Sequence, residues 1–112
     1  MATSTTTFKA KGAAVSNAFA TIYTAPGATT TLVHSLIIAN KSAAAITVDV
    51  RFRDSSAVTD YYLVKAAPIE IGGSLIVAGD NNKLILETGD YIEAQSSAAA
   101  SGDATISYME MA

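Results

Sequence analysis

The strongest constraint on the fold is a short stretch in which apolar and polar side chains alternate without interruption. Residues 46–53 read ITVDVRFR, with an apolar residue at every even position and a polar or charged residue at every odd position. A helix would repeat its apolar positions every three or four residues, whereas a strand places successive side chains on opposite faces. The stretch therefore predicts a strand that buries Val50 and Phe52 and exposes Arg51 and Arg53.

The rest of the chain reads as short β-rich segments separated by proline, glycine, asparagine and aspartate. No segment has the apolar stripe of an amphipathic helix. Strands are expected over residues 19–24, 31–40, 46–53, 58–65, 74–78, 83–87, 91–96 and 104–111. This spacing predicts an all-β fold, a single antiparallel β-sandwich of about eight strands, arranged as a jelly roll or as an immunoglobulin-like Greek key.

Three details of the predicted sandwich depend on local sequence. Residues 31–40 are apolar on both faces, so they are expected to form a central strand that is covered on both sides. Pro68 is expected to end the strand over residues 58–65, because proline cannot donate a ladder hydrogen bond. Residues 96–103 read SSAAASGD and are expected to form a flexible hairpin loop.

Composition excludes several classes of function. The chain has 112 residues, enough for one domain, and no cysteine, which excludes disulfides and thiol nucleophiles and fits a reducing compartment. Its net charge is −3 with only 15% charged residues and no basic cluster, so we expect no nucleic-acid partner. The apolar runs are too short to span a membrane, and residues 1–7 lack the apolar region of a signal peptide, so we expect no membrane partner.

The N-terminal segment has no pattern that would bury it in a sandwich. Residues 1–17 are expected to form an extended arm, and residues 18–112 the β-sandwich domain. A frayed terminus is the alternative. An aromatic side chain on a flexible segment often anchors it to a partner, so Phe8 and the neighbouring Lys9 and Lys11 are candidate partner-binding residues.

The residue inventory argues against an enzyme. His34 is the only histidine, and Ser35 beside it points to the opposite face of the same strand, so the two cannot form a catalytic pair. The turns at residues 80–82 and 88–90 carry potential Ca²⁺ ligands, but tight turns need the same residue types, and the ligand spacing of an EF-hand is absent. We expect no catalytic, metal or cofactor site, and a core or interface position for His34.

Two strand residues complete the predicted partner contacts. Arg53 lies on the exposed face of the alternating strand, and Tyr62 lies in the strand that follows it. Tyr61, Tyr62 and Tyr91 could instead form a sugar-stacking platform. Because neighbours on a strand face opposite sides, one of Tyr61 and Tyr62 is expected to point into the core.

Several segments resemble a known group of proteins. They are TIYTAPGATTT (residues 21–31), VHSLIIAN (33–40), KLILETGDYI (83–92) and ISYME (106–110). Together they resemble small virion proteins of tailed bacteriophages, notably those of marine and cyanobacterial phages. The resemblance covers residues 18–112 and departs from the group's pattern in the first turn, where proline and glycine are more closely spaced.

This resemblance implies a β-sandwich structural protein of the virion, on the head or the tail, assembled in the host cytoplasm. We expect a capsid decoration (cement) protein that binds the major capsid protein and stabilises contacts between capsomers. The expected state is a homo-oligomer, with a trimer favoured. The alternatives are a tail, fibre or adaptor component and a carbohydrate-binding receptor module.

Overall fold

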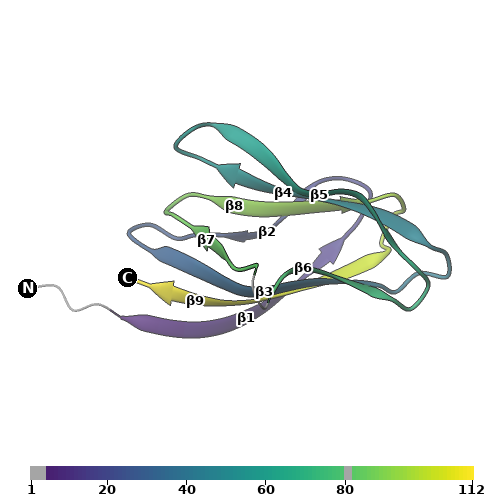
Figure 1. The fold of residues 1–112 in the computed structure, drawn as a ribbon, viewed down its shortest axis with the longest axis horizontal. Coiled ribbons are helices and arrows are strands. Elements are labelled where there is room, and N and C mark those ends of the chain that lie inside the picture. The colour runs from purple at the N-terminus through teal and green to yellow at the C-terminus, as the bar shows by residue number, and fades with distance from the viewer. Residues whose placement is uncertain (1–4, 80–81) are drawn as a thin grey trace, which may run out of the picture.

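The structure, a computed structural model, describes residues 5–79 and 82–112, and within them it consists of nine strands and no helix (Figure 1). The strands are β1 (Thr6–Val15), β2 (Ala20–Thr24), β3 (Thr30–Asn40), β4 (Ile46–Asp54), β5 (Thr59–Ile69), β6 (Ser74–Ala78), β7 (Leu84–Leu86), β8 (Tyr91–Ser96) and β9 (Gly102–Met111). They form two antiparallel sheets that pack face to face. Sheet A has the order β1-β9-β3-β6, with β7 also paired to β3, and sheet B has the order β2-β8-β4-β5.

The connectivity of these strands is that of a jelly roll. β1 pairs with β9, β2 with β8, β3 with β6 and β4 with β5, so that the pairs nest around the turn between β4 and β5. A long hairpin folded across two sheets produces this nesting. The predicted all-β sandwich is therefore confirmed, and of the two arrangements considered, the topology is the jelly roll.

The alternating segment forms β4, as its pattern predicts. Val48 and Val50 are buried, with Val50 at 0% exposure, whereas Thr47, on the opposite face of the strand, is exposed. Phe52 is only partly buried, and its ring stacks on Tyr61 near the turn into β5, with 6.3 Å between the ring centroids. Phe52 therefore contributes less to the core than the pattern alone suggests.

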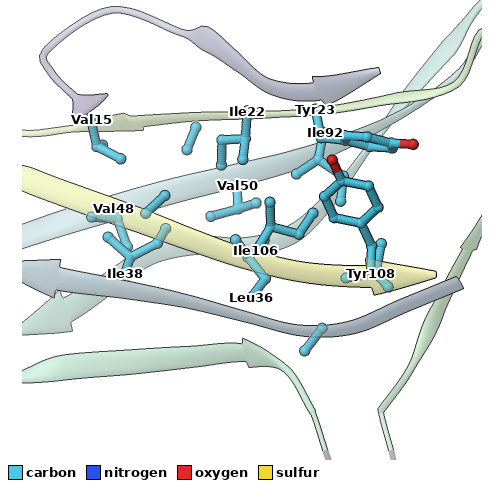
Figure 2. Packing of buried hydrophobic residues seen from close by; sticks show 14 of the residues in the cluster. Val15, Ile22, Tyr23, Leu36, Ile38, Val48, Val50, Ile92, Ile106 and Tyr108 are labelled. Atoms are coloured by element: carbon cyan, nitrogen blue, oxygen red, sulfur yellow. The ribbon is translucent and has the colours of Figure 1, made fainter. Parts of the chain in front are cut away.

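The core lies between the two sheets and is built almost wholly from aliphatic side chains. β3 and β9 of sheet A face β4 and β8 of sheet B, and each contributes alternate residues to the interior (Figure 2). At one end of this core the rings of Tyr23 and Tyr108 pack together, with their centroids 4.3 Å apart. The fully buried apolar side chains of the core include Ile22, Leu36, Ile38, Val48, Val50, Ile92 and Ile106.

Residues 6–15, which the sequence analysis assigns to an arm, form the edge strand β1 of sheet A. The pairing with β9 runs from Thr6 opposite Met111 to Val15 opposite Gly102. Most side chains of β1 are exposed on both faces, and Val15, at 1% exposure, joins the core. Because backbone groups make the pairing, the side chains of this strand need no period, and the sequence pattern does not reveal it.

Pro68 does not end the fifth strand, as the sequence predicts, but lies within β5. β5 is an edge strand, where a missing N–H group breaks no ladder hydrogen bond. Two residues earlier the strand is irregular: Ala66 has a φ of 51°, and its N–H donates to Asp49 Oδ1 at 2.7 Å. The backbone bond also lowers the pKa of the Asp49 carboxyl, because it stabilises the charged form.

The serine- and alanine-rich tract is likewise not a hairpin loop. It crosses from β8 in sheet B to β9 in sheet A. The hydroxyl groups of Ser96 and Ser101 lie 2.6 Å apart and are both buried, and the Ser101 hydroxyl donates to the Ala98 carbonyl at 2.8 Å. Serine side chains therefore fix this crossing in one conformation.

Candidate interaction surfaces

The structure places the five predicted partner-binding residues at three locations. Phe8 lies on the outer face of sheet A, whereas Arg53 and Tyr62 lie on β4 and β5 of sheet B. Lys9 and Lys11 lie on the opposite side of β1 from Phe8, in register with the buried residues Tyr108 and Ile106 of β9. No single surface therefore contains all five residues.

The outer face of sheet A is crossed by rows of side chains that follow the strand register. Two of these rows are largely apolar and extend across four strands. In order from β1, they are Phe8, Met109, Leu32 and Ile85, and Gly12, Thr105, Ile37 and Ile76. Phe8, Ile76 and Ile85 are 71%, 67% and 59% exposed, so large apolar side chains meet solvent at this face.

Charge distinguishes the two outer faces of the sandwich. Within the strands of sheet A, all of which the structure describes, the outer face carries one charged side chain, Asp103, which pairs with Lys41 at 2.9 Å. The outer face of sheet B carries several charged groups, paired across β8, β4 and β5. The outer face of sheet A therefore lacks the charged groups that usually solvate an exposed sheet.

The prediction that residues 31–40 are covered on both sides is wrong for the side that lies on this face. β3 is central in sheet A, and its inner residues Leu36 and Ile38 are fully buried. On its outer side, however, Leu32 is partly exposed and Ile37 is 37% exposed. Residues 5–79 and 82–112 therefore cover only the inner face of this strand.

His34 occupies an irregular position on the same outer face. Val33 pairs with Tyr108 and Ser35 pairs with Ser107, so His34 is the extra residue of a bulge in β3. Because of this bulge, His34 and Ser35 both lie on the outer face, and the prediction that they point to opposite faces is wrong. Its ring stacks on Phe8 across β9, with centroids 5.9 Å apart. Its Nε2 atom is buried and has no hydrogen-bond partner among the residues described.

The outer face of sheet B presents a cluster of aromatic and cationic side chains. The guanidinium of Arg51 lies over the Phe19 ring, 3.6 Å from its centroid, and its Nε donates to Glu93 Oε1 at 2.8 Å. Tyr62, which is 47% exposed, lies beside it, with the Lys65 Nζ 4.5 Å from the Tyr62 centroid. Tyr62 is among the partner-binding residues predicted from the sequence, whereas Arg51 is predicted only to be exposed, since no sequence pattern links it to Phe19.

The other predicted residue of sheet B is held by a neighbour. Arg53 Nη1 donates to Asp60 Oδ2 at 3.2 Å, across the β4–β5 pair. Both side chains are partly exposed, so this ion pair adds little stability. Arg53 borders the aromatic–cationic cluster and is available at its edge.

Lys9 belongs to a polar cluster that joins the two sheets. Its Nζ lies 2.9 Å from Glu110 Oε1, and the Tyr23 hydroxyl donates to Glu110 Oε2 at 2.5 Å. Thr31 Oγ1 lies 2.8 Å from the same hydroxyl and donates to it, since the tyrosine proton is already engaged. These contacts connect β1, β9, β2 and β3, so Lys9 has a structural partner, whereas Lys11 is exposed.

The tyrosine pair departs from the expected arrangement. Tyr61 and Tyr62 are 52% and 47% exposed, and neither enters the core. They point to opposite sides of the edge strand β5: Tyr61 stacks on Phe52, and Tyr62 lies near Arg51. The two rings therefore form no common platform.

The turn residues considered as Ca²⁺ ligands have structural roles where the structure describes them. Asp90 is buried and accepts hydrogen bonds from the N–H groups of Ser55 and Glu87, each at 3.0 Å. Asp80 and Asn81 lie outside the described residues. Among the residues that are described, no three histidine or acidic side chains gather where they could hold a metal ion.

An open hollow of about 380 Å³ lies at the edge where β5, β6 and β7 approach one another. Apolar side chains of Leu63, Val77 and Leu84 line it, together with Asn82 and Lys83. The described residues that line it include no acid–base pair or nucleophile of the kind that hydrolytic chemistry requires.

In the described part of the chain, no helix has the length and apolarity needed to cross a bilayer. Comparison with known proteins adds no relative: no family model, no curated protein and no solved structure matches this chain. The resemblance to phage virion proteins therefore stays a prediction from the sequence.

Proposed function

We propose that this chain is a structural protein of a tailed-bacteriophage virion, a capsid decoration protein that binds the head surface. The aromatic–cationic cluster on sheet B is the observation that carries this proposal. Arg51, Tyr62 and Lys65 are held in place by ring and ion-pair contacts before any partner arrives. Tyrosine and arginine in such preorganised positions are the residue types that dominate protein–protein interfaces.

Two further features support a structural role on a particle. The jelly roll is a fold used by many capsid domains, although a fold alone does not fix a function. The sandwich is also rigid, because hydrogen bonds between side chains and backbone fix its turns at Ser55, Ser101 and Asp90. A rigid module that binds neighbouring capsomers at several points gains strength through effective concentration.

The proposal is tested by co-sedimentation of the purified protein with undecorated phage heads. Tyr62→Ala should lower the affinity for heads at least about tenfold, as loss of an interface anchor does. Tyr61→Ala is the matched control, since Tyr61 is the preceding residue, is similarly exposed and points to the other side of β5. Equal loss for both variants, or no loss for Tyr62→Ala, would contradict this binding surface.

Head and tail locations are separated by the number of copies per particle. A decoration protein is present in hundreds of copies, whereas a tail, fibre or adaptor component is present in far fewer. Quantified protein gels of purified particles give this number directly. A count in the tail range would overturn the decoration proposal in favour of the tail alternative.

A further inference from the structure

We infer that two copies of this chain pack against each other through the outer faces of their A sheets. This face has large apolar side chains exposed to solvent and a single charged residue, Asp103, at one end. Its central strand has the sequence of a strand covered on both sides, yet the residues that the structure describes cover only the inner side. A surface of this kind is stable when another apolar surface covers it.

The strand register makes the face complementary to itself. The middle row of the face contains Ala10, Ser107 and Ser35. A two-fold axis that lies in the contact plane along this row places each strand over the same strand of the other copy. The row of Phe8 in one copy then lies over the row of Gly12 in the other. Phe8, the largest side chain of β1, thus packs over Gly12 of the other copy, which has no side chain.

The same rotation pairs the remaining residues of the two rows. Met109 lies over the partner's Thr105, Leu32 over the partner's Ile37 and Ile85 over the partner's Ile76, in the order given by the register. Aliphatic groups therefore meet aliphatic groups, and neither copy places a charge in the middle of the contact. A neutral face suits a second copy, because like charges would otherwise oppose the approach of two chains of net charge −3.

The size of the face is sufficient for a stable pair. β1 and β9 are each 10 residues long. β3 has 11 residues, and β6 and β7, with 5 and 3 residues, share the fourth position beside it. At the usual strand spacing and rise, these strands present roughly 600 Å² per copy, or about 1,200 Å² in total. This reaches the lower bound of about 1,200 Å² for specific interfaces.

One edge of each sheet, β1 in sheet A and β5 in sheet B, is less suited to association than this face. The edge strand β1 carries Lys9 and Lys11, and the edge strand β5 carries Pro68 and the irregular position at Ala66. Lysine, proline and bulges on edge strands oppose the addition of another strand. Face-to-face packing about a two-fold axis gives a dimer, in place of the trimer that the sequence analysis favours.

The first test is the mass of the purified chain by sedimentation equilibrium. The wild-type chain should have twice its monomer mass of 11.5 kDa. Gly12→Leu should raise the dissociation constant at least tenfold, because the leucine occupies the space that Phe8 of the other copy needs. A Cβ at Gly12 meets only the Ala104 carbonyl, at 3.8 Å, so the variant leaves the monomer intact.

Gly27→Leu is the matched control, since a Cβ there contacts nothing within 4 Å and the residue lies in the turn between β2 and β3. This variant should dimerise like the wild type. The inference would be overturned if the wild-type chain stayed monomeric up to about 1 mM or sedimented with the mass of three chains. It would also be overturned if Gly12→Leu left the dimer unaffected.

The second test uses the absence of cysteine from the chain. Packed sheets lie about 10 Å apart, so a bismaleimide of similar length should link Ser107→Cys to its own copy across the axis. Thr21→Cys, on the outer face of sheet B, should stay unlinked. Linkage of Thr21→Cys alone would overturn the inference, as would a Ser107→Cys variant that links only when phage heads are added. Since both tests use the chain alone, the pairing does not depend on the proposed function.

Discussion

The polar cluster of Lys9, Tyr23, Thr31 and Glu110 shows how a single carboxylate stabilises the sandwich. Glu110 accepts from the Tyr23 hydroxyl and the Lys9 ammonium, and these bonds lower the pKa of its carboxyl below the ordinary value of 4.5. Burial of the Tyr23 ring and its bond to this carboxylate raise the pKa of the Tyr23 hydroxyl, which therefore stays protonated as a donor. The charged form of Glu110 is thus favoured in the folded state.

A lowered pKa in the folded state gives stability that is present above pH 4.5 and lost as the pH falls through the folded-state pKa. Glu110→Gln should lower the free energy of unfolding by about 1 kcal/mol at neutral pH, where a charged hydrogen bond is replaced by a neutral one. It should also make the free energy of unfolding fall less steeply as the pH is lowered through the acid range. Urea titrations at several pH values measure both effects, and a pH dependence identical to that of the wild type would contradict this role.

Arg51 illustrates a residue whose environment differs from its sequence pattern. Its position in the alternating strand suggests a solvated charge, for which truncation to alanine should change stability by less than about 0.5 kcal/mol. In the structure its guanidinium stacks on Phe19 and both its Nε and Nη2 donate to Glu93. The loss of stability expected when Arg51 is truncated to alanine is therefore larger than that of a solvated charge.

Arg51→Ala should lower the free energy of unfolding by about 1–2 kcal/mol, the combined effect of a partly desolvated ring contact and a half-buried ion pair. Arg53→Ala is the control, because Arg53 makes one longer bond to a partly exposed Asp60. Its effect should be under about 0.5 kcal/mol. Denaturant melts of the two variants make the comparison, and equal values would show that the Phe19 contact adds nothing.

At the scale of elements, β1 and β9 differ in what they contribute despite being paired along their whole length. β1 is an edge strand whose side chains are mostly exposed, whereas β9 lies between β1 and β3 and buries Ala104, Ile106 and Tyr108. The exposed strand contributes one fully buried residue, Val15, to the core. The inner strand forms part of that core.

Deletion of residues 1–15 should therefore leave a folded protein that melts roughly 10 °C lower, because the variant loses Val15 from the core and the Lys9 contact. If this segment were the flexible arm expected from the sequence, its deletion would leave the melting temperature unchanged. Phe8→Ala is the control: the ring is 71% exposed, so its loss should leave the melting temperature of the monomer unchanged. Differential scanning calorimetry at low protein concentration decides between the two expectations.

The elements that the sequence predicts are those whose side chains carry the information. The alternation in residues 46–53 identifies β4 and its buried face without further help, and Pro, Gly and Asp mark most of the turns. β1 escapes prediction because most of its Thr, Lys, Ala and Gly side chains are exposed, so its backbone pairing with β9 leaves no apolar period in the sequence. Pro68 is misleading because only the sheet order shows that β5 is an edge strand.

The candidate surfaces are predicted less well than the fold, because they depend on register between distant segments. Phe8 and Tyr62 can be selected from the sequence as candidate partner-binding aromatic residues. The row from Phe8 to Ile85, however, forms only when β1, β9, β3 and β7 are aligned. The doubly apolar character of residues 31–40 is the one sequence signal of that row. It correctly indicates two apolar faces, and the second of them is uncovered in this chain.

At the scale of the whole molecule, the jelly roll makes folding depend on contacts between distant parts of the chain. Thr5 and Ala112 exchange backbone hydrogen bonds of 3.0 and 2.9 Å, so segments from both ends of the chain lie side by side (Figure 1). Each nested strand pair except β4–β5 joins segments separated by at least one other strand. Folds with such contacts form slowly, since long loops must close before the contacts are made.

Deletion of residues 102–112 should abolish the folded state, because it separates β1 from β3 and removes the centre of sheet A. Dispersed amide resonances in an NMR spectrum report the fold, and they should collapse in this variant but persist when residues 1–15 are deleted. A folded protein without β9 would show that the sandwich closes by direct pairing of β1 with β3.

The central position of β9 also has a consequence for protein synthesis. The strand made ninth lies between the strand made first and the strand made third, so sheet A closes only after residue 111 has left the ribosome. The outer face of sheet A includes residues of both β1 and β9, and it therefore does not exist in any shorter nascent chain. If two copies pair through this face as inferred above, prematurely terminated chains that lack β9 would be unable to join a pair.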